Sequence, residues 1–214
     1  DEDAGLAVAV GASGGGQSCG GGLHMIDVTD PLGPEFVGCF GDPRTGMGTG
    51  YSHDAQCVTY RGPDARYRDH QICLGSNGGA LSIADVTDRA RPIALAAAGY
   101  PNSVFLHQGW FSEDQRYFFM NDEIDEIAGV TPRTRTLVWD LERLDDPVLV
   151  NEHMGTTAAS DHNLYIRGDT MYQANYVSGL RILDISDPEN PREVGYFDTV
   201  PGENAPGFAG AWSV

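Results

Sequence analysis

Three histidines recur in the sequence at nearly equal intervals, and their side chains are the residues best suited to chemistry. His53, His107 and His162 are separated by 54 and 55 residues. Each stands at the start of a short apolar segment that is typical of a β-strand. Imidazole is the commonest metal ligand near neutral pH, and three imidazoles leave a coordination position open. The spacing therefore predicts a site for Zn²⁺ or another divalent transition metal.

Further polar residues accompany the histidines and are predicted to orient them or to contact a ligand. They stand at the ends of the following strands or beside the histidines: Asn77, Glu123, Asn175, Asp54 and Asp161. Trp212 takes the equivalent place in the last repeat and interrupts the histidine series. The alternative is that the histidines pack between repeats and bond the backbone, and this structural role is favoured over metal binding.

The elements that must position these residues are repeats of an apolar strand closed by an aspartate and a turn. The four copies are GLHMIDVTDP at 22–31, ALSIADVTDR at 80–89, TLVWDLERL at 136–144 and GLRILDISDP at 179–188. Their aspartates, Asp27, Asp85, Asp140 and Asp184, are expected to bond the backbone of the turn and to be structural. Each copy is the third of four short strands, and such a unit is the signature of a β-propeller blade.

The chain is therefore predicted to be all-β, a propeller of four-stranded antiparallel blades with about four units. The units span approximately 1–45, 46–100, 101–155 and 156–200, and 201–214 begins a further strand. The first unit lacks its first strand, and FAGAWSV resembles a first strand. Either this last strand completes the opening blade and closes a ring of four, or 1–214 is part of a larger propeller. The second alternative is favoured because rings of four are uncommon.

Composition excludes some partners. Lys and Arg number 13 against 31 Asp and Glu, which gives a net charge of -18. Such a surface repels nucleic acid and anionic membranes, and no apolar run approaches the roughly 18 residues of a membrane span. The acidic run NDEIDE at 121–126 lacks the spacing of an EF-hand, so a solvated loop is expected there rather than a Ca²⁺ site.

The four cysteines are predicted to form two disulfides. Cys57 and Cys73 stand in two apolar runs on either side of a turn, and Cys19 and Cys39 bracket a second hairpin. An even number of cysteines without a CxxC motif fits an oxidising compartment, whether extracellular, cell-surface or periplasmic. The alternative is four reduced, buried thiols.

Several long motifs carry a family resemblance. GLHMIDVTDP and GLRILDISDP resemble the LVIVD repeat. Together with SHDAQC, HQGWFSEDQRYFFMNDEIDE and GFAGAWSV, they resemble the choice-of-anchor B family of bacterial surface proteins. The resemblance implies a secreted, cell-surface β-propeller that is longer than this chain and held by a separable C-terminal anchor. It supplies no catalytic residue.

Two functions follow from these patterns. The favoured one is a surface interaction module that presents its loops to a protein or glycan partner, at the cell surface or in an envelope complex. The alternative is a metal-dependent enzyme in which His53, His107 and His162 hold an ion in the central channel. A propeller hosts either role. Enzymatic activity is the less expected, because the resemblance brings no catalytic assignment.

Overall fold

The described residues form four antiparallel sheets that follow one another along the sequence. The computed structural model describes residues 1–12, 18–45 and 50–214. The opening sheet has three strands, β1 (Leu6–Ala9), β2 (Leu23–Asp27) and β3 (Glu35–Phe40). The predicted unit boundary at 45/46 adjoins residues 46–49, which lie outside the described residues. Among the described residues, no helix has the length and apolarity needed to cross a membrane.

The other three sheets have four strands each, in sequence order across the sheet. The second consists of β4 (Asp54–Thr59), β5 (Gln71–Ser76), β6 (Leu81–Asp85) and β7 (Ile93–Ala98). The third consists of β8 (Leu106–Phe111), β9 (Tyr117–Asp122), β10 (Arg135–Asp140) and β11 (Val148–Met154). The fourth consists of β12 (Leu164–Arg167), β13 (Thr170–Ala174), β14 (Leu180–Asp184) and β15 (Arg192–Phe197). Three 3₁₀ turns lie in connections: η1 (Cys19–Gly21), η2 (Pro43–Thr45) and η3 (Ala65–Tyr67).

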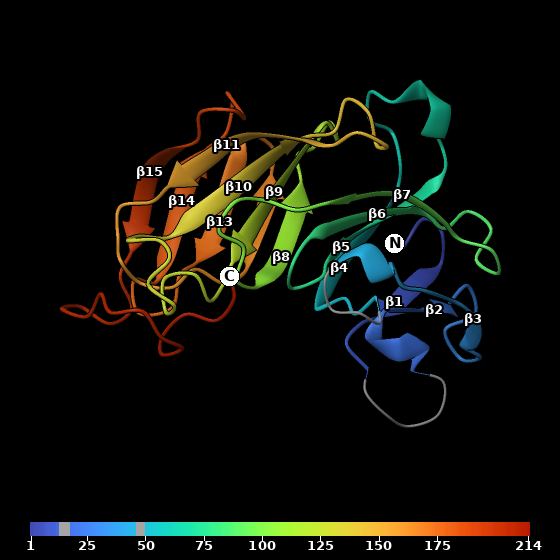
Figure 1. Cartoon of the computed structure of the whole chain (residues 1–214), viewed down its shortest axis with the longest axis horizontal. Helices are drawn as coiled ribbons and strands as arrows, with labels where there is room; N and C mark the ends of the chain where they lie inside the picture. The colour runs from blue at the N-terminus through green and yellow to red at the C-terminus, as the bar shows by residue number, and fades with distance from the viewer. Residues whose placement is uncertain (13–17, 46–49) are drawn as a thin grey trace.

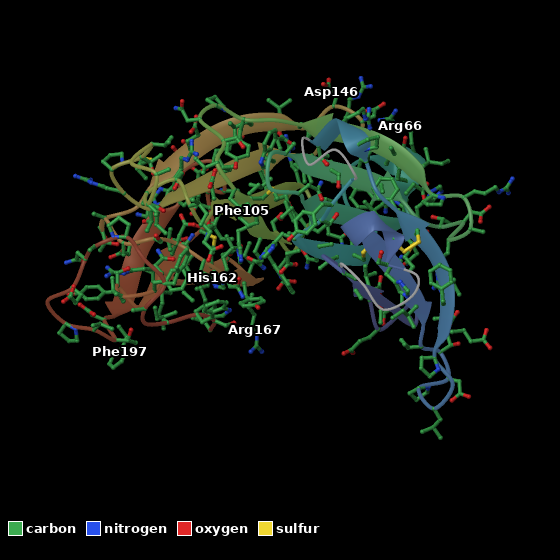
Figure 2. All side chains as sticks on the ribbon, turned by 60° about the horizontal axis from the view of Figure 1, so that its bottom comes forward. Arg66, Phe105, Asp146, His162, Arg167 and Phe197 are labelled. Atoms are coloured by element: carbon green, nitrogen blue, oxygen red, sulfur yellow. A yellow bond between two sulfur atoms is a disulfide. The ribbon has the colours of Figure 1, made fainter. Side chains whose placement is uncertain are left out.

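The sheets lie side by side in an arc, so each is one blade of a β-propeller (Figure 1). Strand β8 contacts β4 of the preceding blade and β12 of the following one, which places the first strands next to one another. Figure 2 shows Phe105 and His162 toward the inner side of the arc, and Arg66 and Asp146 at its outer rim. The predicted all-β propeller, with three complete blades and a partial opening blade, is confirmed.

Apolar side chains hold neighbouring blades together, and strand β9 shows how. Successive residues of a strand point to opposite faces of its sheet. Phe118 and Met120 pack into the cluster shared with the preceding blade, which includes Leu74. Phe119 packs into the cluster shared with the following blade, which includes Leu164. Both faces of the sheet are thus buried, which explains why this strand, YFFMND, is apolar almost throughout instead of alternating.

The four repeat aspartates are structural, as predicted. Asp27 and Asp85 each accept hydrogen bonds from the backbone N–H and the hydroxyl of the threonine two residues on. Asp140 and Asp184 likewise accept from the backbone N–H two residues on. Just before each aspartate, the pairing between third and fourth strands shifts register in the same way in every blade. A bulge at this place increases the local twist of the outer strand.

The C-terminal segment pairs with the blade β12–β15 in the way that one complete blade pairs with the next. Ala211 and Tyr176 exchange two backbone hydrogen bonds, of 2.8 and 3.1 Å. Leu106 and Gly78 form the same bridge between two complete blades. Trp212 therefore stands where His107 stands in the earlier repeat. The opening sheet has no fourth strand among the described residues, so this segment does not complete it.

Both predicted disulfides, Cys57–Cys73 and Cys19–Cys39, are present. Cys57 and Cys73 are direct cross-strand partners in β4 and β5, and closing a loop of 16 residues restricts the unfolded chain. We expect the double substitution Cys57→Ala and Cys73→Ala to lower the free energy of unfolding by about 3 kcal/mol. Urea unfolding under non-reducing conditions measures it. A loss below about 0.5 kcal/mol would show that this crosslink contributes nothing to stability.

Candidate metal centre

The three predicted histidines lie in one row on the inner side of the arc, because they occupy equivalent positions in successive blades. The ring centroids of His53 and His107 are 4.4 Å apart, and those of His107 and His162 are 4.2 Å apart. The indole of Trp212 continues the row, 4.6 Å from the ring of His162. His107 and His162 are buried and His53 is half-buried.

Glu123 lies between two of these imidazoles. Its Oε2 is 3.6 Å from Nε2 of His107, and its Oε1 is 3.6 Å from Nε2 of His162. One ligand atom from each of the three side chains lies within 4.8 Å of the other two. Two ligand atoms bound to one tetrahedral Zn²⁺, each about 2.0–2.1 Å from the ion, are roughly 3.3 Å apart. The three side chains are therefore close to the spacing that such an ion requires.

Two hydrogen bonds hold the site in this arrangement. Nδ1 of His162 donates to the backbone carbonyl oxygen of Trp212. That bond fixes the proton on Nδ1 and leaves the lone pair on Nε2, which has no hydrogen-bond partner within the described structure. The hydroxyl of Tyr176 donates to Oε1 of Glu123. Metal-binding histidines and carboxylates are commonly oriented by partners of this kind.

The imidazoles are held in the neutral form that a metal requires. Burial, and then the neighbouring His162 and His53, lowers the pKa of His107 to about 2. Burial also lowers the pKa of His162 and of His53 below the usual range. Burial, and then the hydrogen bond to Glu123, raises the pKa of Tyr176, so its hydroxyl stays protonated and able to donate. At neutral pH the site therefore offers two imidazole lone pairs beside the side chain of Glu123.

His53 and Asp54 lie beside this group rather than within it. The ring of His53 stacks on His107, and its Nδ1 is 3.0 Å from the hydroxyl of Tyr51. It is not one of the three side chains whose ligand atoms converge. Asp54 follows it, and successive residues of an extended chain point to opposite sides. Burial raises the pKa of Asp54 to about 6. In the described part of the chain Asp54 does not bond an imidazole.

The other predicted polar residues contact different partners. Asn77 and Asn175 follow strands β5 and β13, as Glu123 follows β9. Oδ1 of Asn77 accepts a hydrogen bond of 2.6 Å from the hydroxyl of Ser52. Asp161 accepts a hydrogen bond of 2.9 Å from the backbone N–H of Arg135. Neither of these contacts reaches an imidazole nitrogen.

Two contributors to the site went unrecognised in the sequence. Tyr176 and the carbonyl of Trp212 both come from segments more than 50 residues beyond Glu123. Tyr176 follows Asn175 directly, so the position after the second strand of each blade could have drawn attention to it. A backbone carbonyl gives no sequence signal.

The lowered pKa of His107 makes stability fall in acid. In the unfolded chain its pKa is near 6.5, and in the folded protein about 2. Between these values the unfolded state binds the proton and the folded state does not, so stability decreases as the pH falls below 6.5. For the metal-free protein, we expect the wild type to lose about 1.6 kcal/mol more than His107→Gln between pH 6.5 and pH 5. Urea unfolding at both pH values measures this. Equal losses would contradict it.

The fold and the histidine row define the chain as a β-propeller with a polar inner face. The model of the LVIVD repeat family matches residues 160–199, which cover the blade β12–β15. The chain is thus a β-propeller, and one of its blades matches the LVIVD repeat. A search of curated proteins by sequence gives no match.

Three solved structures, one of them a named β-propeller domain, share the architecture. The β-propeller domain of Cps50 (Swd1) from Myceliophteria thermophila matches with a TM-score of 0.55 and 12% identity, over 87% of this chain and 56% of that one. A protein from Lactobacillus plantarum matches with a TM-score of 0.58 and 12% identity, over 93% of this chain and 56% of that one. A functionally unknown protein from Desulfotomaculum acetoxidans matches with a TM-score of 0.58 and 13% identity, over 94% of this chain and 59% of that one. The chain thus spans between 56% and 59% of these relatives, and such low identities establish the fold alone.

Proposed function

We propose that this chain binds a divalent transition metal on the inner face of the propeller, through His107, Glu123 and His162. The observation that carries the proposal is the convergence of three buried ligand atoms from two neighbouring blades within 4.8 Å of one another. Packing alone does not require a carboxylate to face two imidazole nitrogens at 3.6 Å, beyond hydrogen-bond distance.

Two imidazoles and one carboxylate suit Zn²⁺, Co²⁺ or Fe²⁺, and three protein ligands leave at least one position for water or a bound molecule. When bound, such an ion supplies a Lewis acid to that position. His162 is oriented by the carbonyl of Trp212 and Glu123 by the hydroxyl of Tyr176, which fixes two of the three ligands in advance. The neighbouring His53 can contact whatever occupies the open side.

Metal content and Co²⁺ spectroscopy test this proposal. The chelator-treated protein is titrated with Co²⁺, and the expected result is one ion per chain with the visible absorption of a site of low coordination number. His107→Ala is expected to lose that absorption. His153→Ala, which removes a histidine from the outer strand β11, is the matched control and is expected to keep it. Absence of saturable Co²⁺ binding in the wild type would overturn the proposal.

We further propose that the propeller acts outside the cell or in the envelope, as a module that binds a protein or glycan partner. The two disulfides support an oxidising compartment, and the resemblance to the choice-of-anchor B family supports the cell surface. The test is co-purification from native envelope material, together with mass analysis of the cysteines. A free monomer with four reduced thiols would contradict this assignment.

A further inference from the structure

The C-terminal segment, residues 207–212, lies against the metal centre and is the part of that site with the least burial. Residues 201–206, which lead into it, are exposed. Within the segment, the side chain of Phe208 is 55% exposed and that of Trp212 is 61% exposed. A stretch with so few buried apolar contacts opens at a low cost in free energy. Its attachment to the last blade therefore depends on a small number of specific contacts.

The contacts of the segment gather around Tyr176, which is fully buried. The backbones of Ala211 and Tyr176 exchange hydrogen bonds of 2.8 and 3.1 Å. The ring of Trp212 makes an edge contact with the ring of Tyr176, with 5.9 Å between the centroids. The backbone N–H of Gly207 donates to Oγ of Ser160 at 3.2 Å. The segment is thus attached to rigid parts of the blade β12–β15, although it is exposed itself.

The same contacts reach two of the three metal ligands. Nδ1 of His162 donates to the carbonyl oxygen of Trp212, and the two rings are 4.6 Å apart. Tyr176, whose backbone pairs with the segment, donates its hydroxyl to Oε1 of Glu123. When the segment leaves, His162 loses the acceptor that fixes its proton on Nδ1, and water competes for both ring nitrogens. Docking therefore prepares Nε2 of His162 to bind an ion.

The other two ligands are held by segments that the blades bury. His107 lies in strand β8, which is buried along most of its length. Glu123 belongs to the acidic run NDEIDE at 121–126. The expectation that this run forms a solvated loop is wrong, because Asp122 and Asp125 are fully buried. The ligand from the following blade is therefore the one whose orientation depends on docking of the C-terminal segment.

We propose that docking of residues 207–212 and metal binding by His107, Glu123 and His162 form one coupled equilibrium, through which the segment controls how tightly the site holds its ion. This inference rests on the proposed metal function. Coupling between two binding events is reciprocal. The docked segment raises the affinity for the ion, and the bound ion holds the segment against the blade. Loss of a partner that orients a metal ligand costs about 10–100-fold in affinity, so a similar factor is expected in the docking equilibrium.

Gly210 allows the segment to be released without a change in any ligand. Its φ is +105°, and a Cβ at this position would lie 2.2 Å from the carbonyl oxygen of Tyr176. Gly210→Ala is therefore expected to open the bridge between Ala211 and Tyr176 and to weaken Zn²⁺ binding by about 10–100-fold. Gly202 has a similar φ of +94° but nothing within 4 Å of its Cβ position. Gly202→Ala is the matched control, and its affinity is expected to change less than about twofold.

Amide hydrogen exchange of the wild type measures the reverse effect. The N–H of Ala211 donates to the carbonyl oxygen of Tyr176 at 2.8 Å, so its exchange reports opening of the segment. Saturating Zn²⁺ is expected to slow exchange at Ala211 by a factor similar to the loss of affinity in Gly210→Ala. The N–H of Gly33 bonds within a turn of the opening blade, and its exchange is expected to stay unchanged.

The outcomes separate this inference from the metal function. Zn²⁺ binding by the wild type, with unchanged affinity in Gly210→Ala and unchanged exchange at Ala211, would overturn the coupling and leave the metal centre in place. Weaker binding by the variant without slower exchange in the wild type breaks reciprocity and would overturn it as well. A wild type without saturable Zn²⁺ binding would overturn the metal centre, and the coupling with it. The exchange experiment needs no variant, so it decides even where Gly210→Ala does not fold.

Discussion

Replacing His107 with alanine is expected to lower the affinity of the chain for Zn²⁺ by at least about 100-fold. Loss of residues that only orient metal ligands costs about 10–100-fold, and removal of a ligand exceeds that. His107 is central to the row, with one imidazole on each side and the carboxylate of Glu123 3.6 Å from its Nε2. Competition with a chromophoric chelator at pH 7.5 measures the change.

Two further variants calibrate this result. Tyr176→Phe removes the hydroxyl that donates to Glu123, and a loss of affinity of about 10–100-fold is expected. His153→Ala is expected to leave the affinity unchanged. If His107→Ala and His153→Ala bind Zn²⁺ as tightly as the wild type, the ion is held elsewhere and the histidine row is a packing feature.

Replacing Arg135 with leucine is expected to lower the free energy of unfolding by about 3–5 kcal/mol, since it leaves buried carboxylates without their cation. The side chain of Arg135 is 2% exposed and lies 2.8 Å from Asp125 and 2.9 Å from Glu152. Its guanidinium also donates to the backbone carbonyl oxygens of Pro101 and Asn102. Urea unfolding at pH 7 measures the loss.

Arg66 provides the matched control. It forms ion pairs of 2.7 Å with Asp64 and Asp145, but its side chain is 49% exposed. Asp64 is buried, but it keeps its hydrogen bonds from the backbone N–H groups of residues 66 and 144. Water screens the exposed guanidinium, so Arg66→Leu is expected to cost no more than about 1 kcal/mol. Equal losses for Arg66→Leu and Arg135→Leu would contradict the role given to burial.

The repeat made the fold and the histidine row predictable. The repeat aspartates close equivalent strands, so counting back from each of them places His53, His107 and His162 at one level of successive blades. The turns of these aspartates are local, formed with residues two positions on. Local contacts of this kind can be predicted from a single sequence.

Contacts between blades were not predictable in the same way. Glu123 was expected to orient the histidines or to contact a ligand, and it lies between the imidazoles of His107 and His162. Glu126 and Asp161, which leads into the next blade, are buried as well. Neither sequence spacing nor charge density distinguishes such a buried carboxylate from a solvated one, since burial depends on how the neighbouring blade packs.

Anomalous diffraction from crystals of the chain grown with Zn²⁺ would test the central claim most directly. Data collected on both sides of the zinc absorption edge locate the ion independently of any assumption about its ligands. We expect one peak about 2.0–2.1 Å from Nε2 of His107, Nε2 of His162 and a carboxylate oxygen of Glu123. A map with no peak among these three side chains at saturating Zn²⁺ would contradict the proposed metal centre.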